Sequence, residues 1–400
     1  MGKIEKYLDE NWEKCIKENR ESSGSLIGLP YKYTIPSAGH FNELYYWDTY
    51  FTNVGLLQSD RAELAKSNTD NMLYLVNKYG FMPNGNRTFF LNRSQPPFLS
   101  EMVKDVYEYY KDEAWLSGAY SVLETEYKFW MEKRVLPIGL NHYGNITLTE
   151  KASVYANEFK NRIASGYEDK TELEIARHSH AMCESGWDMN PRWEFEAYNY
   201  VQVDLNSLLY GFENNMAYFA EILGRENSWK ERAEKRLEAM NKYMLTDDGI
   251  FLDYNFAKNT KSSVFSAASY FPLYAGAATE EQAKALADKL GLLEEKYGVC
   301  TCEKQNDGID YQWGYPNGWA CLQFIVIKGF LNYGYDDIAK RIAKKYVDLA
   351  EKVFDETGNL WEKYNVVDGN INVKNEYEMP PMLGWSAGVY IYSKNLLERK

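Results

Sequence analysis

Cysteine and histidine are scarce in this chain of 400 residues. The five cysteines are an odd number scattered along the sequence, and of the four histidines only His178 and His180 lie close together. Scattered, odd cysteines do not indicate a disulfide framework and are typical of a reducing compartment. Without clustered cysteine and histidine ligands, the spacing of a zinc site is missing. The sequence therefore predicts neither a disulfide framework nor a metal site.

Long apolar segments and an excess of basic residues are missing as well. Residues 1–24 are charged and lack the apolar core of a secretory signal, and the apolar run 322–331 is short and interrupted by Lys328. With 45 Lys+Arg against 58 Asp+Glu, the net charge is −13, which argues against the basic surface that nucleic acids and anionic membranes require. We expect a soluble cytoplasmic protein that binds neither nucleic acid nor membrane.

Strand patterns are rare, whereas helical periodicity covers most of the chain. Between Leu205 and Gly224, apolar residues recur every three or four positions, as in an amphipathic helix. Similar patterns predict helices over about 3–19, 60–79, 98–110, 113–134, 169–182, 226–244, 264–275, 279–291, 318–333, 336–354 and 385–398. Segments 249–255 and 358–366 are typical of short hairpin arms, and each carries an acid shortly before a tyrosine. No linker-like tract interrupts the chain, so we predict a single all-α domain over residues 1–400, with helix hairpins around a central pocket.

Aromatic residues are unusually frequent. They make up 16% of the chain, with 34 Tyr, 18 Phe and 11 Trp. Tyrosine and tryptophan combine an apolar face with a polar group, so a surplus favours a cleft that stacks rings against a flat ligand such as a sugar. A tyrosine-rich core is the alternative explanation.

Five non-helical stretches, 36–51, 83–97, 183–193, 311–319 and 375–389, concentrate tryptophan, amides and acids. Hydrolysis of a glycosidic bond commonly uses one carboxylic acid that protonates the leaving oxygen and a second carboxylate that acts as base or nucleophile. Asp188, directly after Trp187, and Glu376, directly before Tyr377, are the candidates for these roles. Candidates for hydrogen bonds to sugar hydroxyls are Asn84, Arg93, Gln95 and Gln312, and candidates for ring stacking are Trp47, Trp313 and Trp385.

The motifs in these stretches resemble those of the trehalase family, in the same order along the chain. The first is Tyr45-Tyr46-Trp47-Asp48-Thr49-Tyr50-Phe51, and the second is Asn92-Arg93-Ser94-Gln95-Pro96-Pro97. The third is Glu184-Ser185-Gly186-Trp187-Asp188, followed by Gln312-Trp313 with Tyr315-Pro316-Asn317-Gly318-Trp319, and finally by Glu376-Tyr377 with Gly384-Trp385. The resemblance covers nearly the whole chain, from about residue 36 to 389.

The resemblance implies an (α/α)6 barrel, a toroid of helix hairpins with short β-hairpins in its loops. It also implies cofactor-free hydrolysis of a small α-glucoside with inversion, with Asp188 as general acid and Glu376 as general base. Inversion requires roughly 6.5–9.5 Å between the two carboxyl groups, because a water molecule must fit between them. The sugar-binding residues that it implies are Phe41, Tyr45, Trp47, Asp48, Asn84, Arg93, Gln95, Gly186, Gln312, Trp313 and Trp385.

Three positions depart from the family pattern. His40 stands where trehalases carry an arginine, Gly314 stands where they carry an aspartate, and an arginine-containing segment before the acid has at most Lys151 as its counterpart. Arginine makes planar, bidentate contacts that lysine and histidine do not reproduce, so these changes affect which sugar is accepted. The main hypothesis is cleavage of α,α-trehalose or a close small α-glucoside. The alternatives are another small α-glycoside, such as glucosylglycerate or mannosylglycerate, or a sugar-binding protein without turnover.

Overall fold

The computed structural model describes all residues except 1, 145–155, 158–168, 374–376, 382 and 400. Its α-helices are α1 (Lys3–Trp12), α2 (Tyr46–Leu56), α3 (Ala62–Tyr79), α4 (Leu99–Tyr110), α5 (Glu113–Lys133), α7 (Glu172–Ser185), α8 (Val203–Ile222), α9 (Trp229–Tyr243), α10 (Phe271–Ala275), α11 (Glu280–Lys289), α12 (Ala320–Asn332), α13 (Asp336–Thr357) and α14 (Gly384–Glu398). Its strands are β1 (Ile16–Lys17), β2 (Tyr33–Thr34), β3 (Tyr200–Val201), β4 (Tyr254–Asn255), β5 (Thr260–Lys261), β6 (Glu294–Glu295), β7 (Gly298–Val299), β8 (Asn317–Trp319) and β9 (Lys363–Asn365).

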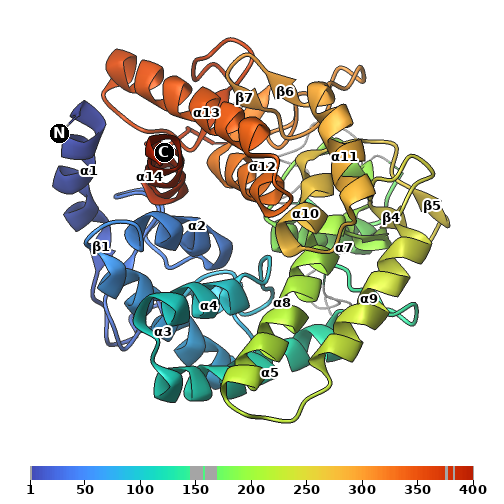
Figure 1. The fold of residues 1–400 in the computed structure, drawn as a ribbon, viewed down its shortest axis with the longest axis horizontal. Coiled ribbons are helices and arrows are strands. Elements are labelled where there is room, and N and C mark those ends of the chain that lie inside the picture. The colour runs from blue at the N-terminus through green and yellow to red at the C-terminus, as the bar shows by residue number, and fades with distance from the viewer. Residues whose placement is uncertain (1, 145–155, 158–168, 374–376, 382, 400) are drawn as a thin grey trace.

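The helices form a closed ring (Figure 1). The inner helices α2, α4, α8, α10, α12 and α14 contact one another in chain order, and α14 packs against α2 to close the circle. Helices α3, α5, α9 and α13 pack on the outside of these inner helices. The prediction of an all-α toroid of helix hairpins is therefore confirmed.

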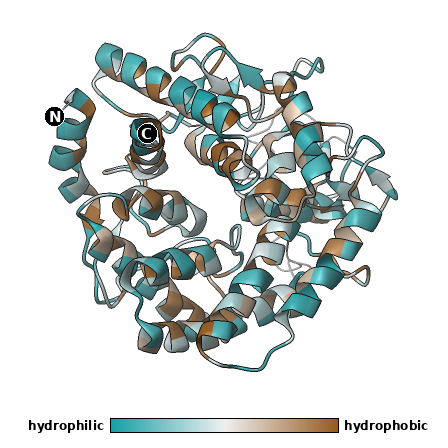
Figure 2. Cartoon of the chain, in the orientation of Figure 1, coloured by the Kyte–Doolittle hydropathy of each residue, from teal (hydrophilic) through white to brown (hydrophobic). Residues whose placement is uncertain are grey.

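The inner and the outer helices differ in hydropathy, as α12 and α13 illustrate (Figure 2). The outer helix α13 buries one face, which includes Ile342, Tyr346 and Leu349, and leaves its charged face toward solvent. The inner helix α12 is apolar nearly all round, as expected for a helix surrounded by other helices. No helix in the described part of the chain combines the length and apolarity that crossing a membrane would take.

Helix α2 is absent from the sequence-based prediction because every one of its residues is buried. A helix with no polar face has a weak amphipathic period, and the polar and aromatic residues of 36–51 led us to expect a non-helical stretch where α2 begins. The predicted helix 3–19 ends at Trp12, because residues 16–17 pair with β2 instead. The predicted helix 264–275 is helical in its second half, where Pro272 lies in the first turn of α10 and a short 3₁₀ turn precedes it.

The predicted hairpin arms are also present as strands, and one of them pairs with a strand that is distant in the sequence. Strand β4 pairs with β3 and β5, whereas β9 pairs with β8, so that Lys363 lies opposite Trp319. This pairing connects the segment before α12 to the segment after α13. It places two distant stretches of sequence at the same end of the ring.

Helices α2 and α14 approach each other through glycine. A Cβ atom on Gly388 would lie 2.0 Å from the backbone oxygen of Phe51, and a Cβ atom on Gly55 would lie 2.5 Å from Cα of Gly388. Real Cβ atoms do not come this close to a backbone, so any larger residue at these positions pushes the two helices apart. The closure of the ring therefore depends on these two glycines.

Substitution of Gly388 by alanine tests this contact. We expect Gly388→Ala to lower the free energy of unfolding by about 1–3 kcal/mol or more, because overpacking forces the backbone to shift. The measurement is urea denaturation followed by circular dichroism.

Gly118→Ala is the matched control, since Gly118 lies in helix α5 and a Cβ atom added there would meet no neighbouring atom within 4 Å. This change should stabilise the protein by about 0.5–1 kcal/mol, because alanine favours helix over glycine. Equal unfolding midpoints for Gly388→Ala and the wild type would contradict the proposed tight contact.

Candidate active site

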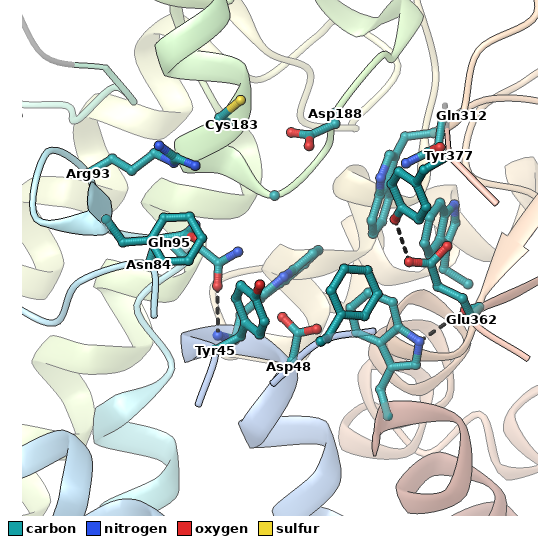
Figure 3. A pocket seen from close by; sticks show the side chains of 17 residues that line it. Tyr45, Asp48, Asn84, Arg93, Gln95, Cys183, Asp188, Gln312, Glu362 and Tyr377 are labelled. Atoms are coloured by element: carbon teal, nitrogen blue, oxygen red, sulfur yellow. Dashed lines mark hydrogen bonds between the residues drawn. The ribbon is translucent and has the colours of Figure 1, made fainter. Parts of the chain in front are cut away.

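A pocket of about 340 Å³ opens at the end of the ring where the inner helices begin (Figure 3). Its walls come from the segments before α2, α4, α12 and α14, from the end of α7, and from the residue before β9. The lining residues are Phe41, Tyr45, Trp47, Asp48, Asn84, Phe90, Arg93, Gln95, Cys183, Gly186, Asp188, Gln312, Trp313, Trp319, Glu362, Tyr377 and Trp385. This volume is within the range of small-molecule sites.

The pocket brings together every sugar-binding residue that the sequence predicted, and it also contains Asp188. Glu376, the predicted base, lies outside the described residues, and so does Lys151. Five lining residues were not predicted as site residues, namely Phe90, Cys183, Trp319, Glu362 and Tyr377. The only signal for Glu362 was its place in a hairpin arm, as an acid two residues before a tyrosine.

The carboxylates of Asp48, Asp188 and Glu362 enter the pocket from different sides (Figure 3). Asp48 lies in the first turn of α2, and burial raises the pKa of its carboxyl to about 7. The negative charge of Glu362 adds to this rise. Asp188 follows α7 and lies above Asp48 in this view, with Glu362 to the right of both.

Glu362 is held by donors on both of its carboxylate oxygens. The hydroxyl of Tyr377 donates to Oε1 at 2.5 Å, and the ammonium of Lys363 donates to Oε2 at 2.8 Å. Its backbone oxygen accepts the indole N–H of Trp385 at 3.0 Å, which ties the residue to the start of α14. Glu362 is 2% exposed, so these contacts replace most of the water that a carboxylate would otherwise bind.

Gly186 allows the chain to turn from α7 toward Asp188. It ends the helix in the left-handed conformation, with φ of 75°. A Cβ atom at this position would lie 2.7 Å from the ring of Trp47. Both the backbone conformation and the lack of space require glycine at this position.

Arg192 fixes the loop that carries Asp188. Its guanidinium is fully buried and donates to both oxygens of Asp253 at 2.9 Å and to Asp204 at 2.6 Å. The same guanidinium lies 4.3 Å from the centre of the Trp187 ring. Because Trp187 immediately precedes Asp188, this contact limits the movement of the candidate acid.

A second buried ion pair joins Glu184 of α7 to Arg134, the residue after α5. Burial alone would raise the pKa of Glu184, but the charge of Arg134, which donates to it twice at 2.8 Å, lowers that pKa to about 2. Glu184 also accepts the backbone N–H of Ser94 at 2.8 Å. Ser94 follows Arg93, so the ion pair positions a pocket-lining residue from outside the pocket.

Four tryptophan rings pack against one another at the pocket. Trp313 stacks on Trp319 with ring centres 3.8 Å apart and planes 6° apart, and Trp47 lies tilted against Trp313 at 5.5 Å. Trp385 meets Trp313 edge-on at 6.4 Å. Indole faces of this kind bind the C–H faces of a sugar ring, while the amides and Arg93 supply hydrogen bonds to hydroxyls.

The two departures from the family pattern that the structure describes do not line the pocket. His40 is exposed, and Gly314 is buried behind the lining, where a Cβ atom would lie 2.8 Å from Cβ of Tyr311. Among the described residues, no group of three or more His, Cys, Asp or Glu side chains is arranged to hold a metal ion. The site therefore offers carboxylates, neutral donors, one guanidinium and aromatic faces, which is the chemistry of proton transfer to and from a bound sugar.

The chain is similar to named trehalases over almost its full length. It is 31% identical over 425 residues to a periplasmic trehalase of Xanthomonas axonopodis pv. citri (strain 306), covering 99% of this chain and 74% of that protein. A neutral trehalase from Saccharomyces cerevisiae shares 31% identity and a TM-score of 0.78, covering 92% of this chain and 74% of that one. A mannosylglycerate hydrolase from Thermus thermophilus shares the fold, with a TM-score of 0.68 and 15% identity over 97% of this chain and 99% of that one.

The expectation of a cytoplasmic location is wrong, because the curated relatives that the chain matches at 31% identity are named periplasmic trehalases. The expectation relied in part on unpaired cysteines. None of the five, all in the described part of the chain, forms a disulfide, and four of them are buried. Buried thiols are shielded from oxidants, so they do not require a reducing compartment.

The resemblance of the motifs to the trehalase family is confirmed on the whole chain. A family model described as Trehalase matches residues 2–398. The match includes all the lining residues of the pocket, from Phe41 to Trp385. The chain belongs to the trehalase family and is a glycoside hydrolase.

Proposed function

We propose that this protein hydrolyses α,α-trehalose with inversion at one anomeric carbon, with Asp188 as general acid and Glu362 as general base. The observation that carries the proposal is that the carboxylates of Asp188 and Glu362 enter one tryptophan-lined pocket from different walls (Figure 3). The trehalases that the chain resembles at 31% identity favour trehalose as the substrate. The mannosylglycerate hydrolase supports the fold alone, because its identity is 15%.

The surroundings of Glu362 favour the role of base. A general base must be ionised before the reaction, and hydrogen bonds to the charged form of a carboxylate stabilise that form. Glu362 accepts from a phenol and from an ammonium, so both contacts favour the carboxylate ion. Each of its oxygens has a second lone pair, so it can also accept a hydrogen bond from a water molecule on the pocket side.

Asp188 then supplies the proton for the leaving group. It enters the pocket from the segment after α7, and its place in the chain matches the acid segment of the family motifs. Asp48 also lines the pocket, and the raised pKa of its carboxyl favours a hydrogen-bonding role toward a sugar hydroxyl.

The proton balance of the reaction follows from these positions. Asp188 protonates the glycosidic oxygen as the bond to the anomeric carbon breaks. Water attacks the same carbon from the other side and gives a proton to Glu362. One glucose leaves as the β-anomer and the other as the α-anomer, and a proton returns from Glu362 to Asp188 through solvent.

A proton NMR time course with α,α-trehalose tests substrate and stereochemistry together. We expect α- and β-glucose in equal amounts before mutarotation, because one ring inverts and the other is released unchanged. Release of α-glucose alone would contradict inversion. No release from trehalose, with release from glucosylglycerate or mannosylglycerate, would contradict trehalose as the substrate.

Two single substitutions test the assignment of the carboxylates. Asp188→Asn and Glu362→Gln should each lower kcat by at least about 10²-fold, since each removes a proton-transfer group. Circular dichroism should show unchanged helix content in both. Glu376→Gln is the comparison, because the sequence alone suggested Glu376 as the base. If Glu376→Gln lost turnover while Glu362→Gln retained it, the base would be Glu376 and not Glu362.

A further inference from the structure

Lys363 is a buried lysine beside the proposed base, and no step of the mechanism above moves a proton to or from it. Its side chain is fully buried, and its ammonium lies 2.8 Å from Oε2 of Glu362. The same ammonium lies 4.9 Å from the centre of the Trp319 ring and 5.5 Å from that of Tyr377. A carboxylate and two aromatic faces therefore surround the positive charge.

The local backbone makes this contact unusual. Lys363 is the first residue of β9 and pairs with Trp319 of β8, and Glu362 immediately precedes it. Successive side chains of an extended segment point to opposite sides, so neighbours in sequence do not normally meet. The ammonium of Lys363 nevertheless contacts Glu362, and it does so while lying over the ring of Trp319.

Stability does not explain why a lysine occupies this position. Removing two charges from water costs about as much as their attraction returns, and apolar replacements of buried pairs are often neutral or stabilising. A buried pair of this kind adds little to the net free energy of folding. This one lies at the edge of the pocket and includes the proposed base, which points to a role in the reaction. A fixed ammonium next to a carboxylate favours the ionised form of that carboxylate.

Other titratable groups face Glu362 from the elements packed around it. They are Tyr377 before α14, Asp48 in α2, Cys321 in α12, and Asp188 across the pocket. The carboxyl of Asp48 adds negative charge when it ionises, which disfavours a second charge on Glu362. Lys363 opposes this effect, because it brings a positive charge into direct contact with the base.

We propose that Lys363 is a positioning residue that keeps Glu362 ionised and holds its carboxylate toward the water molecule that attacks the sugar. The proposal rests on the proposed function, in which Glu362 is the general base. Lys363 itself does not touch the substrate, since it is not among the residues that line the pocket. Its effect on turnover is exerted through Oε2 of Glu362.

The test is the pH dependence of kcat/KM for α,α-trehalose in Lys363→Met. The acid limb of this profile reports protonation of the base in the free enzyme. Loss of the ammonium disfavours the carboxylate ion, so Glu362 takes up its proton more readily and the acid limb should move to higher pH by about 1–3 units. A lysine that only supported the fold would leave the position of this limb unchanged.

Three further variants make the result specific. Lys363→Arg keeps the charge and should return the acid limb toward its wild-type position. Lys345→Met removes a lysine that lies 2.7 Å from Glu294, away from the pocket, and should leave the limb unchanged. If Lys363→Met does not fold, Lys363→Gln, which removes the charge but keeps a donor, carries the same expectation.

The outcomes separate this inference from the proposed function. A folded, active Lys363→Met with a wild-type acid limb overturns the role of Lys363, while an inactive Glu362→Gln measured alongside leaves the base assigned. Normal turnover by Glu362→Gln overturns the assignment of the base, and the role of Lys363 with it. A shifted acid limb that Lys363→Arg restores supports both.

Discussion

The contact between α2 and α14 is the one on which the pocket depends. These helices belong to opposite ends of the sequence, and their backbones meet because Gly55 and Gly388 have no side chains to separate them. Asp48 lies in the first turn of α2 and Trp385 in the first turn of α14. Trp385 in turn binds the backbone of Glu362. A contact between two helices therefore decides the distance between carboxylates that lie far apart in the sequence.

The buried ion pairs hold the loops at the pocket, whereas the contact between α2 and α14 holds helices. Arg192 stands between Asp204 and Asp253 and supports Trp187, next to the candidate acid. Glu184 of α7 pairs with Arg134 at the end of α5 and also accepts the backbone N–H of Ser94, in the loop that carries Arg93. Charges of this kind add little to the net free energy of folding when both partners are present. Their directional hydrogen bonds restrict the geometry, so they hold the loops in one arrangement.

The residues that the sequence singled out by a local signal lie together in the structure. Short motifs such as Trp47-Asp48 and Arg93-Ser94-Gln95 lie in polar, aromatic stretches, and the pocket collects residues from each of them. Glu362 was not predicted as a site residue, because its neighbours resemble an ordinary hairpin arm and its place at the pocket comes from the pairing of β9 with β8. Helix α2 was missed for a related reason, since complete burial removes the polar face that periodicity detects.

The position of α14 as the helix that closes the ring has a consequence for synthesis of the protein. The ribosome adds about 5–20 residues per second, so α14 emerges many seconds after α2. Until then the side of α2 that will meet α14 has no partner, although every residue of α2 is buried in the finished fold. The nascent chain thus carries an apolar surface through most of its elongation. It is in this interval, before residues 384–398 arrive, that the chain is most exposed to aggregation and most suited to binding by chaperones.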